Sequence, residues 1–364
     1  MANKTARLGD LATYINGYAF KPADWGDTGL PIIRIQDLTG NSYQLNRYDG
    51  DYPERIEVND GDVLISWSAS LGVYVWQRGK ALLNQHIFKV VFDKLPVNKE
   101  YFVFAVEHKL AEMESKTHGA TMKHIVKKDF DGTTIPYPPI EKQAEIADHL
   151  RRITSLIDRQ TEQLLLLDQL VKSRFIELFG TIHDNRFGFG VVTLQDVSAP
   201  IKDGTHQTPT YTTDVENGYK FLSSKDVTTG KVDWSHLKYI PEELHRELYA
   251  RISPRRGDIL LAKNGTTGIA AIVDRDEVFD IYVSLALIRP HGVDPTYLWA
   301  AINAAETKQQ FDASLKGIGV PNLHLGEIKK ARIILPPMEL QEQFAAFVEQ
   351  TDKSKLCGKM EVAA

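Results

Sequence analysis

Apolar side chains recur at alternating intervals of three and four along residues 140–182, which contain no Gly or Pro before Gly180. One heptad position in this series, Gln160, is polar. The apolar positions are Ile146, Leu150, Ile153, Ile157, Leu164, Leu167, Val171, Phe175 and Leu178. Such spacing predicts one helix that packs along a narrow seam. About 40 residues at 1.5 Å each would form a rod of roughly 60 Å.

A second, shorter helix of this kind is predicted at 337–364, with Phe344, Phe347 and Val348 on its apolar side. A narrow apolar helix needs a partner, and each of these two helices is the natural partner of the other. Because globular segments precede and follow the first helix, we expect the pair to run antiparallel. We also expect Gly358 to end the second helix, which would leave Leu164, Leu167 and Val171 of the first one exposed.

The segments ahead of the two helices have the character of β-structure. Short β-branched and aromatic runs, separated by turns that contain Gly, predict strands at 30–35, 62–67 and 73–76, and again at 219–222, 258–261 and 269–273. A helix is predicted after each set, at 100–113 and at 295–315. Each segment is therefore predicted to be a strand-rich α+β globule.

The two halves of the chain repeat one another at a distance of about 196–198 residues. Gly61-Asp62-Val63-Leu64 returns as Gly257-Asp258-Ile259-Leu260, and Tyr101 returns as Tyr297. The segment 135–143 returns at 334–341, with Pro-Pro and a following Gln in both copies. The period is too long for a solenoid repeat, so it predicts a duplicated domain.

These patterns together predict an α+β fold with two similar globular domains, at 1–139 and 183–336. Long helices at 140–182 and 337–364 would separate the domains and pack as an antiparallel coiled coil. Two copies of one reading domain on one chain favour a partner that carries two separated sites.

Composition narrows the setting in which this protein works. The chain has 364 residues, of which 43% are hydrophobic and 25% charged, as in an ordinary soluble globular protein. Its single cysteine, Cys357, excludes an internal disulfide, and no apolar signal segment opens the sequence. We therefore expect a cytoplasmic location. The formal net charge of −5 means that any surface for nucleic acid must be a local basic stripe.

Three features occur in the same order around the helical rod. They are the repeated Gly-Asp-Val/Ile-Leu strand, the Pro-Pro-Ile/Met-Glu-x-Gln entry into each long helix, and the stretch 143–179. In these features the chain resembles the specificity (S) subunit of type I restriction–modification enzymes, over essentially its whole length. The resemblance implies two target recognition domains, each of which reads one half of a bipartite site in double-stranded DNA. The helices would set the gap between the half-sites.

The resemblance also implies that the chain is a non-catalytic recognition subunit. Two methyltransferase subunits would dock on it, and motor/endonuclease subunits would join for restriction. S-adenosylmethionine, ATP and Mg²⁺ would then be bound by those partners, with no cofactor or metal on this chain. A two-headed coiled-coil scaffold that binds only proteins stays open as an alternative, because only the first function requires affinity for a bipartite duplex of fixed gap.

Bases are read by polar side chains on loops whose backbone approaches the nucleic acid closely. Loops that mix basic, amide and hydroxyl residues with Gly therefore supply the candidates for DNA contact. These are Arg34, Gln36, Ser66, Ser68, Ser70, Lys116, His118, Lys123, Lys202, His206, Lys225, Lys263, Asn264, Thr266, Thr267, Lys316 and Asn322.

No alternative chemistry has a matching motif. The segment 187–190 resembles the glycine turn of an S-adenosylmethionine site, but it lies in a connector and is predicted to be a simple turn. The segment 264–268 lacks the Gly-Lys-Ser/Thr ending of a phosphate-binding loop. The histidines show no spacing typical of metal ligands.

Overall fold

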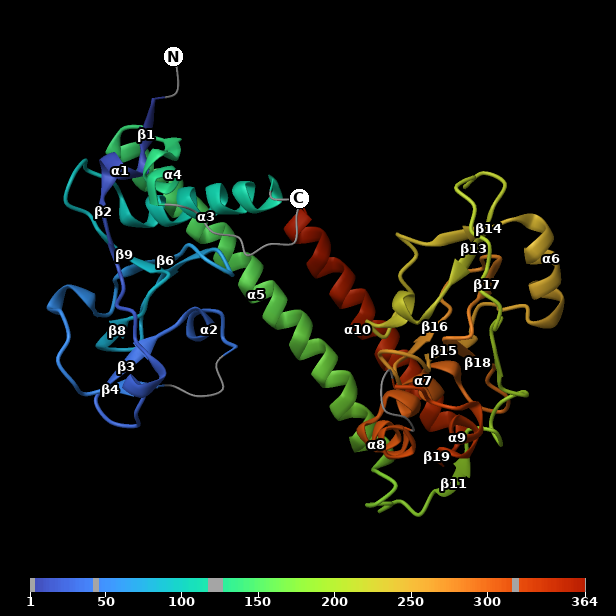
Figure 1. Ribbon diagram of the computed structural model, residues 1–364. Coiled ribbons are helices and arrows are strands. Elements are labelled where there is room, and N and C mark those ends of the chain that lie inside the picture. Colours follow the sequence, from blue (N-terminus) through green and yellow to red (C-terminus); the bar gives the residue numbers. More distant parts are fainter. Residues whose placement is uncertain (1–3, 42–45, 117–126, 316–320, 364) are drawn as a thin grey trace. The chain divides into compact units, whose positions relative to one another are not determined.

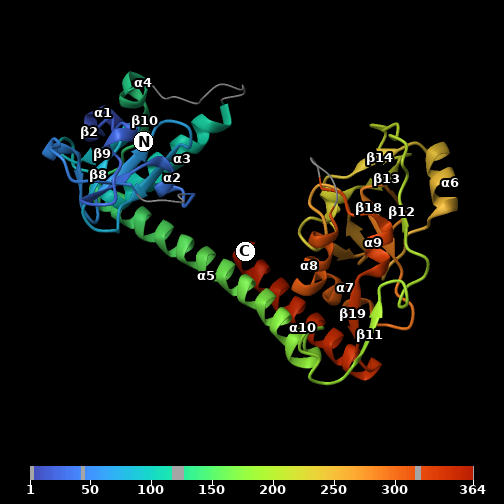
Figure 2. The same ribbon diagram turned by 60° about the horizontal axis from the view of Figure 1, so that its bottom comes forward.

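The computed structural model describes residues 4–41, 46–116, 127–315 and 321–363. The chain divides into two compact units, Met1–Ile157 and Asp158–Ala364, which are called unit 1 and unit 2 below. Figures 1 and 2 show the elements of each unit. Among the described helices, none combines the length and apolar character needed to cross a bilayer.

Unit 1 consists of short strands, short helices and one longer helix, α3. Its strands are β1 (Thr5–Arg7), β2 (Thr13–Asn16), β3 (Leu30–Ile33), β4 (Arg47–Tyr48), β5 (Glu57–Val58), β6 (Val63–Ser66), β7 (Gly72–Val75), β8 (Ala81–Leu83), β9 (Ile87–Val91) and β10 (Thr134–Pro136). Its helices are α1 (Leu8–Leu11), α2 (Ile35–Leu38), α3 (Lys99–Lys116) and α4 (Lys127–Gly132), with 3₁₀ turns η1 (Pro22–Asp24) and η2 (Glu54–Ile56). Helix α5 (Ile140–Phe179) begins in unit 1 and continues into unit 2.

Unit 2 repeats this series of elements. Its strands are β11 (Gly190–Thr193), β12 (Lys202–Asp203), β13 (Tyr219–Leu222), β14 (Lys238–Ile240), β15 (Ile259–Ala262), β16 (Ala270–Ile272), β17 (Phe279–Ile281), β18 (Leu285–Ile288) and β19 (Arg332–Leu335). Its helices are α6 (Glu242–Arg251), α7 (Pro295–Asn303), α8 (Ala305–Ser314), α9 (Leu325–Lys330) and α10 (Met338–Ala363), with the 3₁₀ turn η3 (Ser224–Val227).

The strands of the two units pair in the same topology. In unit 1 one antiparallel sheet has the order β2-β9-β6-β7, a second has the order β4-β3-β8-β5 with β3 parallel to β8, and β1 pairs with β10. In unit 2 the corresponding orders are β12-β18-β15-β16, then β14-β13-β17 with β13 parallel to β17, and β11 with β19. The prediction of two similar α+β domains is therefore confirmed.

The repeated Gly-Asp pair makes the same turn in both units. Gly61 and Gly257 have φ angles of 89° and 85°, which glycine adopts without strain. The Asp62 carboxylate accepts a hydrogen bond from the Asn59 N–H at 2.9 Å, and the Asp258 carboxylate accepts one from the Arg255 N–H at 3.0 Å. The motif thus closes the turn that leads into the central strands β6 and β15.

The repeated Gln after Pro-Pro joins each long helix to its globule. Gln143 accepts from the Asn98 N–H at 2.9 Å and donates to the Pro138 carbonyl at 2.8 Å. Gln341 accepts from the Asp294 N–H at 2.9 Å and donates to the Pro336 carbonyl at 2.8 Å. Both side chains are buried. Each amide therefore bridges the start of a helix and the loop before it, so the two joints are built alike.

The helix predicted at 295–315 is two helices, α7 and α8, separated at Ala304. The backbone of Ala304 is extended, with φ −63° and ψ 146°. The Asn303 side chain donates to the carbonyls of Trp299 and Ala270 and accepts from the Ala270 N–H. This tie between the end of α7 and strand β16 holds the chain where the helix breaks. Unit 1 has one continuous helix, α3, at this place.

Helices α5 and α10 pack side by side and antiparallel within unit 2 (Figures 1 and 2). The Phe344 ring lies 5.5 Å from that of Phe175, between ring centroids, and the Lys355 ammonium lies 2.6 Å from the Asp168 carboxylate. Positions later in α10 therefore contact positions earlier in α5, as expected for antiparallel helices. Six predicted seam residues belong to the apolar core of this unit: Val171, Phe175, Leu178, Phe344, Phe347 and Val348. Phe179, which was not predicted, belongs to the same core.

The expectation that Leu164, Leu167 and Val171 are exposed is wrong. Val171 is buried and the two leucines are half-buried. Because the antiparallel pairing starts at the C-terminal end of α5, a short α10 does not reach the middle of α5, whereas Gln143 and Ala147 near the start of α5 are buried.

The predicted seam positions Leu150, Ile153 and Ile157 are exposed, and Ile146 is half-buried. Gly358 does not end α10, which continues to Ala363. A single Gly costs about 1 kcal/mol within a helix, and its neighbours are good helix formers.

Candidate nucleic-acid interface

Four loops of unit 2 meet at one end of its sheets and carry many of the predicted DNA contacts. The Lys263 N–H donates to the Ser284 carbonyl at 2.9 Å, and the Ser224 N–H donates to the Ser284 hydroxyl at 2.9 Å. The Thr205 N–H donates to the Ile281 carbonyl at 3.2 Å. These bonds join the loops after β12, β13, β15 and β17, so residues far apart in the sequence form one surface.

Unit 1 joins its corresponding loops in the same way. The Trp67 N–H donates to the His86 carbonyl at 3.3 Å, and the Tyr18 N–H donates to the Leu83 carbonyl at 2.9 Å. The Arg34 N–H donates to the Asp37 carboxylate, as the Ser223 N–H does to Asp226 in unit 2.

These shared bonds define matched positions in the two units. Trp67 matches Lys263, His86 matches Ser284 and Arg34 matches Ser223, so that Gln36 matches Lys225. The scaffold is common to the units, while the side chains that it presents differ.

Lys263 is a buried cation rather than a surface one. Its ammonium lies 2.6 Å from the carboxylate of Asp203, and both side chains are about nine-tenths buried. Burial alone would raise the pKa of the Asp203 carboxyl, but hydrogen bonds and charge from Lys263 and His206 hold that pKa below its usual value. An ion pair of this kind fixes the loop after β12 against the loop after β15. Lys263 therefore does not present its ammonium at the surface, but holds the loops of the candidate interface in position.

The loop after β12 is also held from the side of α6. The Arg251 guanidinium donates to the carbonyls of Asp203 and Gly204, at 2.8 and 3.0 Å. Lys202 is exposed, and its ammonium donates to the Arg251 carbonyl at 3.3 Å. His206 is exposed, with its Nε2 at 3.2 Å from Asp203. Lys202 and His206 thus remain on the surface, together with the exposed Lys225.

Asn264 and Asn322 lie opposite one another in an isolated antiparallel bridge. Both residues are partly exposed. Thr266 is exposed at the tip of the same loop, whereas Thr267 is buried. The structure therefore brings the predicted candidates His206, Lys225, Asn264, Thr266 and Asn322 to loops that are joined to one another or directly follow such a loop.

In unit 1 the predicted serines divide into buried and exposed positions. The Ser66 hydroxyl is buried and donates to the Ser70 carbonyl at 2.6 Å, so it closes its own loop. Ser68 is buried and Ser70 is exposed. The side chains of Ser66 and Ser68 are therefore not accessible at the surface of unit 1. Residue type did not distinguish them, because burial depends on the folded neighbours of each position.

Arg34 and Gln36 lie at the start of α2, on the loop after β3. The Arg34 guanidinium carbon lies 5.6 Å from the centre of the Trp25 ring, and its Nε lies 3.5 Å from Asp37. Gln36 is exposed. Trp25 and Tyr18 are exposed aromatic residues on this side of unit 1 that the sequence analysis did not select. A signal was available for Tyr18, which follows Gly17 as Thr205 follows Gly204.

Four predicted contacts cannot be placed. The side chain of Lys116, at the end of α3, and residues His118, Lys123 and Lys316 lie outside the described residues.

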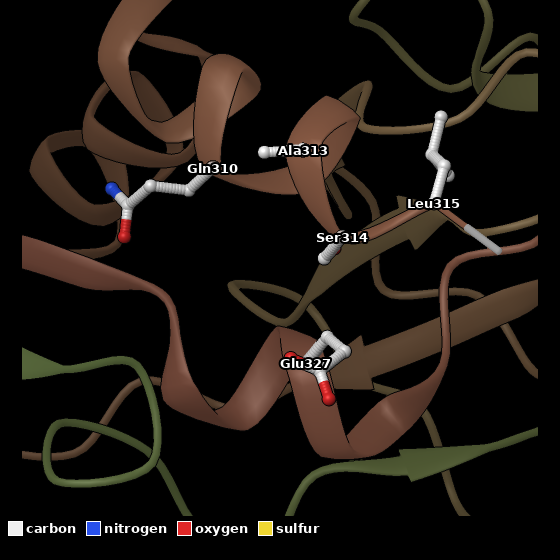
Figure 3. Close-up of a pocket in the computed structure, with 5 residues that line it drawn as sticks. All are labelled: Gln310, Ala313, Ser314, Leu315 and Glu327. Atoms are coloured by element: carbon white, nitrogen blue, oxygen red, sulfur yellow. The ribbon is translucent and has the colours of Figure 1, made fainter.

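A shallow hollow of about 360 Å³ lies near the end of α8 (Figure 3). The polar groups that line it are already engaged. Gln310 exchanges two hydrogen bonds with the backbone of Arg332, Ser314 donates to the Phe311 carbonyl, and Glu327 lies 3.6 Å from Lys330. The hydrogen bonds of Gln310 thus join α8 to β19, and the side chains that line the hollow offer no catalytic arrangement. Within the described ranges, no cluster of three or more His, Cys, Asp or Glu side chains is placed to hold a metal ion.

The two units carry matched sets of loops on one repeated scaffold. This arrangement is typical of a protein that recognises two separate sites on a partner. The chain matches the family described as "Type I restriction modification DNA specificity domain" over residues 2–167 and 188–358. The protein belongs to this family, and it is a specificity subunit of the type I restriction–modification kind.

Two curated relatives have similar sequences over nearly the whole chain. The type I restriction enzyme EcoBI specificity subunit of Escherichia coli is 27% identical over 94% of this chain and 78% of its own length. The MjaVIII specificity subunit of Methanocaldococcus jannaschii is 26% identical over 96% of this chain and 86% of its own.

Among solved structures, the fold is similar to that of the S subunit of a type I restriction–modification system from M. genitalium. The TM-score is 0.57 at 13% identity, covering 99% of this chain and 92% of that chain. A chain from a structure of the type I R-M system has a TM-score of 0.55 at 17% identity, with the same coverage.

Proposed function

We propose that unit 1 and unit 2 each read one half of a bipartite site in double-stranded DNA, and that α5 and α10 set the gap between the halves. The matched loops support this function. The backbone bonds that join them are the same in both units, yet the side chains at matched positions differ: Ser68 and Asn264, and His86 and Ser284. One scaffold with two sets of side chains is what two different half-sites require.

The physical scale of the helix fits this role. Helix α5 has 40 residues without a break, which corresponds to roughly 60 Å at 1.5 Å per residue. Two readers face the same side of B-DNA only when their centres are near a whole number of helical turns apart, about 34 Å each. A stiff helix between two readers would therefore admit one gap length.

The test is a selection from a library of random duplexes, followed by titration of the selected site. We expect one bipartite motif, and affinity should fall when one base pair is added to or removed from the gap. Lys225→Ala should weaken binding to all sequences alike and lower the salt slope by about 1. A single contiguous motif, or indifference to the gap, would contradict the proposal and favour a scaffold that binds only proteins.

Methyltransferase subunits are proposed to dock on α5. Leu156, Leu166 and Leu170 are exposed apolar residues on this helix. At 100° per residue they fall within about 80° of one another, on a face beside the seam rather than in it. Exposed apolar surface of this kind is typical of a protein interface. Motor/endonuclease subunits would join the same complex for restriction.

Catalysis and its cofactors are assigned to the partners in this proposal. S-adenosylmethionine, ATP and Mg²⁺ would be bound by the methyltransferase and motor subunits, and the purified chain alone should transfer no methyl group to DNA. Leu166→Asp with Leu170→Asp should abolish copurification with the methyltransferase subunit. Leu165→Asp is the control, since Leu165 is also exposed on α5 but lies at least about 100° around the helix from the three docking leucines, and it should leave copurification unchanged. Copurification of the double variant would contradict this docking surface.

A further inference from the structure

Asn264 and Asn322 form a paired set of side-chain amides at the candidate interface of unit 2. Their bridge is flanked by hydrogen bonds from Gly265 N–H to the Pro321 carbonyl, at 3.2 Å, and from Leu323 N–H to the Lys263 carbonyl, at 2.8 Å. In this pattern the two bridged residues exchange no backbone bonds themselves. Side chains of such a pair are close, with Cβ atoms about 4.5–5.5 Å apart, and they point to the same face.

The residues on either side anchor this pair. Lys263 and Leu323 are buried, and side chains alternate between faces along an extended segment. Lys263 is held by its ion pair with Asp203, and Leu323 belongs to the apolar core of the unit. The two neighbours therefore fix the backbone from within, while Asn264 and Asn322, which are partly exposed as residues, lie on the opposite face.

The side-chain oxygens of both residues lack a hydrogen-bond partner within the described part of the chain. The Oδ1 atoms of Asn264 and Asn322 are buried and accept no hydrogen bond there. An unsatisfied buried acceptor is costly and needs an explanation. Asn303 in the same unit is a useful comparison, because its amide makes three hydrogen bonds and locks the end of α7. Asn264 and Asn322 therefore do not act as structural ties of that kind.

We propose, on the basis of the function proposed above, that Asn264 and Asn322 read an adenine in the half-site of unit 2. An amide carries an acceptor and a donor in one plane. This arrangement matches the N6 amino group and N7 of adenine in the major groove. Neither residue is charged, so the pair is suited to a base edge rather than to a phosphate.

Unit 1 differs at the matched position, where Ser68 is buried beside the Ser66 loop. Within the described part of unit 1 this position carries no amide, so we assign adenine readout of this kind to the half-site of unit 2. This asymmetry makes the inference specific, because one half of the motif should respond to the substitutions and the other half should not.

The experiment is a random-duplex selection with the full chain, comparing wild type with Asn264→Ala and Asn322→Ala. Wild type should enrich a motif with an adenine at one position of one half-site. Each variant should lose the preference at that position and keep the other half-site. Asn217→Ala is the control, since Asn217 is exposed and its amide bonds to Asp214 within its own loop. Asn264→Leu, which keeps a similar size without the amide or a charge, repeats the test if Asn264→Ala fails to fold.

A second measurement identifies the atoms on the DNA. Replacing the selected adenine by 7-deazaadenine removes the N7 acceptor, and wild-type affinity should fall about 10- to 100-fold. Affinity of the Asn264 and Asn322 variants should already be lower by that factor and should fall little further with the modified base.

The outcomes separate this inference from the proposed function. If wild type enriches no bipartite motif, the proposed function itself fails. If wild type enriches one and the variants enrich the same motif with equal preference, only the adenine assignment is overturned. Equal weakening at all sequences would also overturn it, because that result describes contact with the DNA backbone.

Discussion

The buried amides of Gln143 and Gln341 should each contribute strongly to the stability of their own unit. Gln341→Met keeps the length of the side chain and removes both hydrogen bonds, leaving the Asp294 N–H and the Pro336 carbonyl without this partner. Each orphaned group costs about 1–3 kcal/mol when it is buried. Because one of the two bonds is only partly buried, we expect a total cost of about 3 kcal/mol.

Hydrogen exchange read by mass spectrometry is the suitable assay, since a chain of two units need not unfold in one step. Gln341→Met should speed exchange in α7, β19 and the start of α10. Gln143→Met should speed it in α3, β10 and the start of α5. Gln343→Met is the matched control, because Gln343 is exposed on α10, and it should change exchange in neither unit.

Two results would refute this reasoning. Equal protection in Gln341→Met and wild type would mean that the amide bonds contribute no net stability. Loss of protection confined to α10, with α7 and β19 unchanged, would mean that the Gln does not join the helix to the globule.

Three further predictions concern unit 2. Phe344→Ala should destabilise it by about 3–5 kcal/mol, measured by the same exchange assay, because Phe344 is fully buried between α5 and α10; an unchanged protection of α10 would argue against the packed seam. Lys263→Met should cost about 3–5 kcal/mol at neutral pH by leaving Asp203 buried without its cation, and adding Asp203→Leu should recover most of the loss. Since the pKa of Asp203 is lowered in the fold, the ion pair stabilises fully above pH about 4, and the difference between wild type and Lys263→Met should shrink as pH falls below that value; a constant difference down to pH 2 would be inconsistent with it. Gly204→Ala should prevent normal folding, because its Cβ would lie 2.0 Å from the Ile281 carbonyl oxygen, while Gly265→Ala, with open space around it and φ +75°, should cost only about 1–2 kcal/mol; similar thermal midpoints for the two variants would refute this contrast.

The local sequence pattern was sufficient to predict several of the repeated strands and turns. The strand at 219–222 was predicted with its observed bounds, and the repeated Gly61-Asp62 and Gly257-Asp258 pairs make the same turn. The turn at 187–190 is also observed, with Gly188 at φ 66°. These features depend on side-chain periodicity and on backbone preferences of a few neighbouring residues, which the chain carries locally.

Interface residues were harder to predict, because residue type does not reveal burial. Lys263 has the composition of a DNA contact, yet its ammonium is bound to Asp203 beneath the surface. Asp203 was not selected at all, since a single carboxylate has no distinguishing pattern. Sixty residues separate the two, and only the pairing of β12, β18 and β15 brings them together.

The amino-acid sequence by itself determined that the chain is a duplicated α+β protein with two long amphipathic helices, because hydrophobic period and repeated motifs are properties of the chain order. Only the tertiary structure decided which part of α5 is covered. Helix α10 packs antiparallel against α5, starting near Phe179 at the C-terminal end of α5. Val171 is therefore buried, while Leu150 is exposed. It also decided which polar residues reach the surface, since a hydrogen bond or ion pair from a distant loop can hold the same side chain inside the fold.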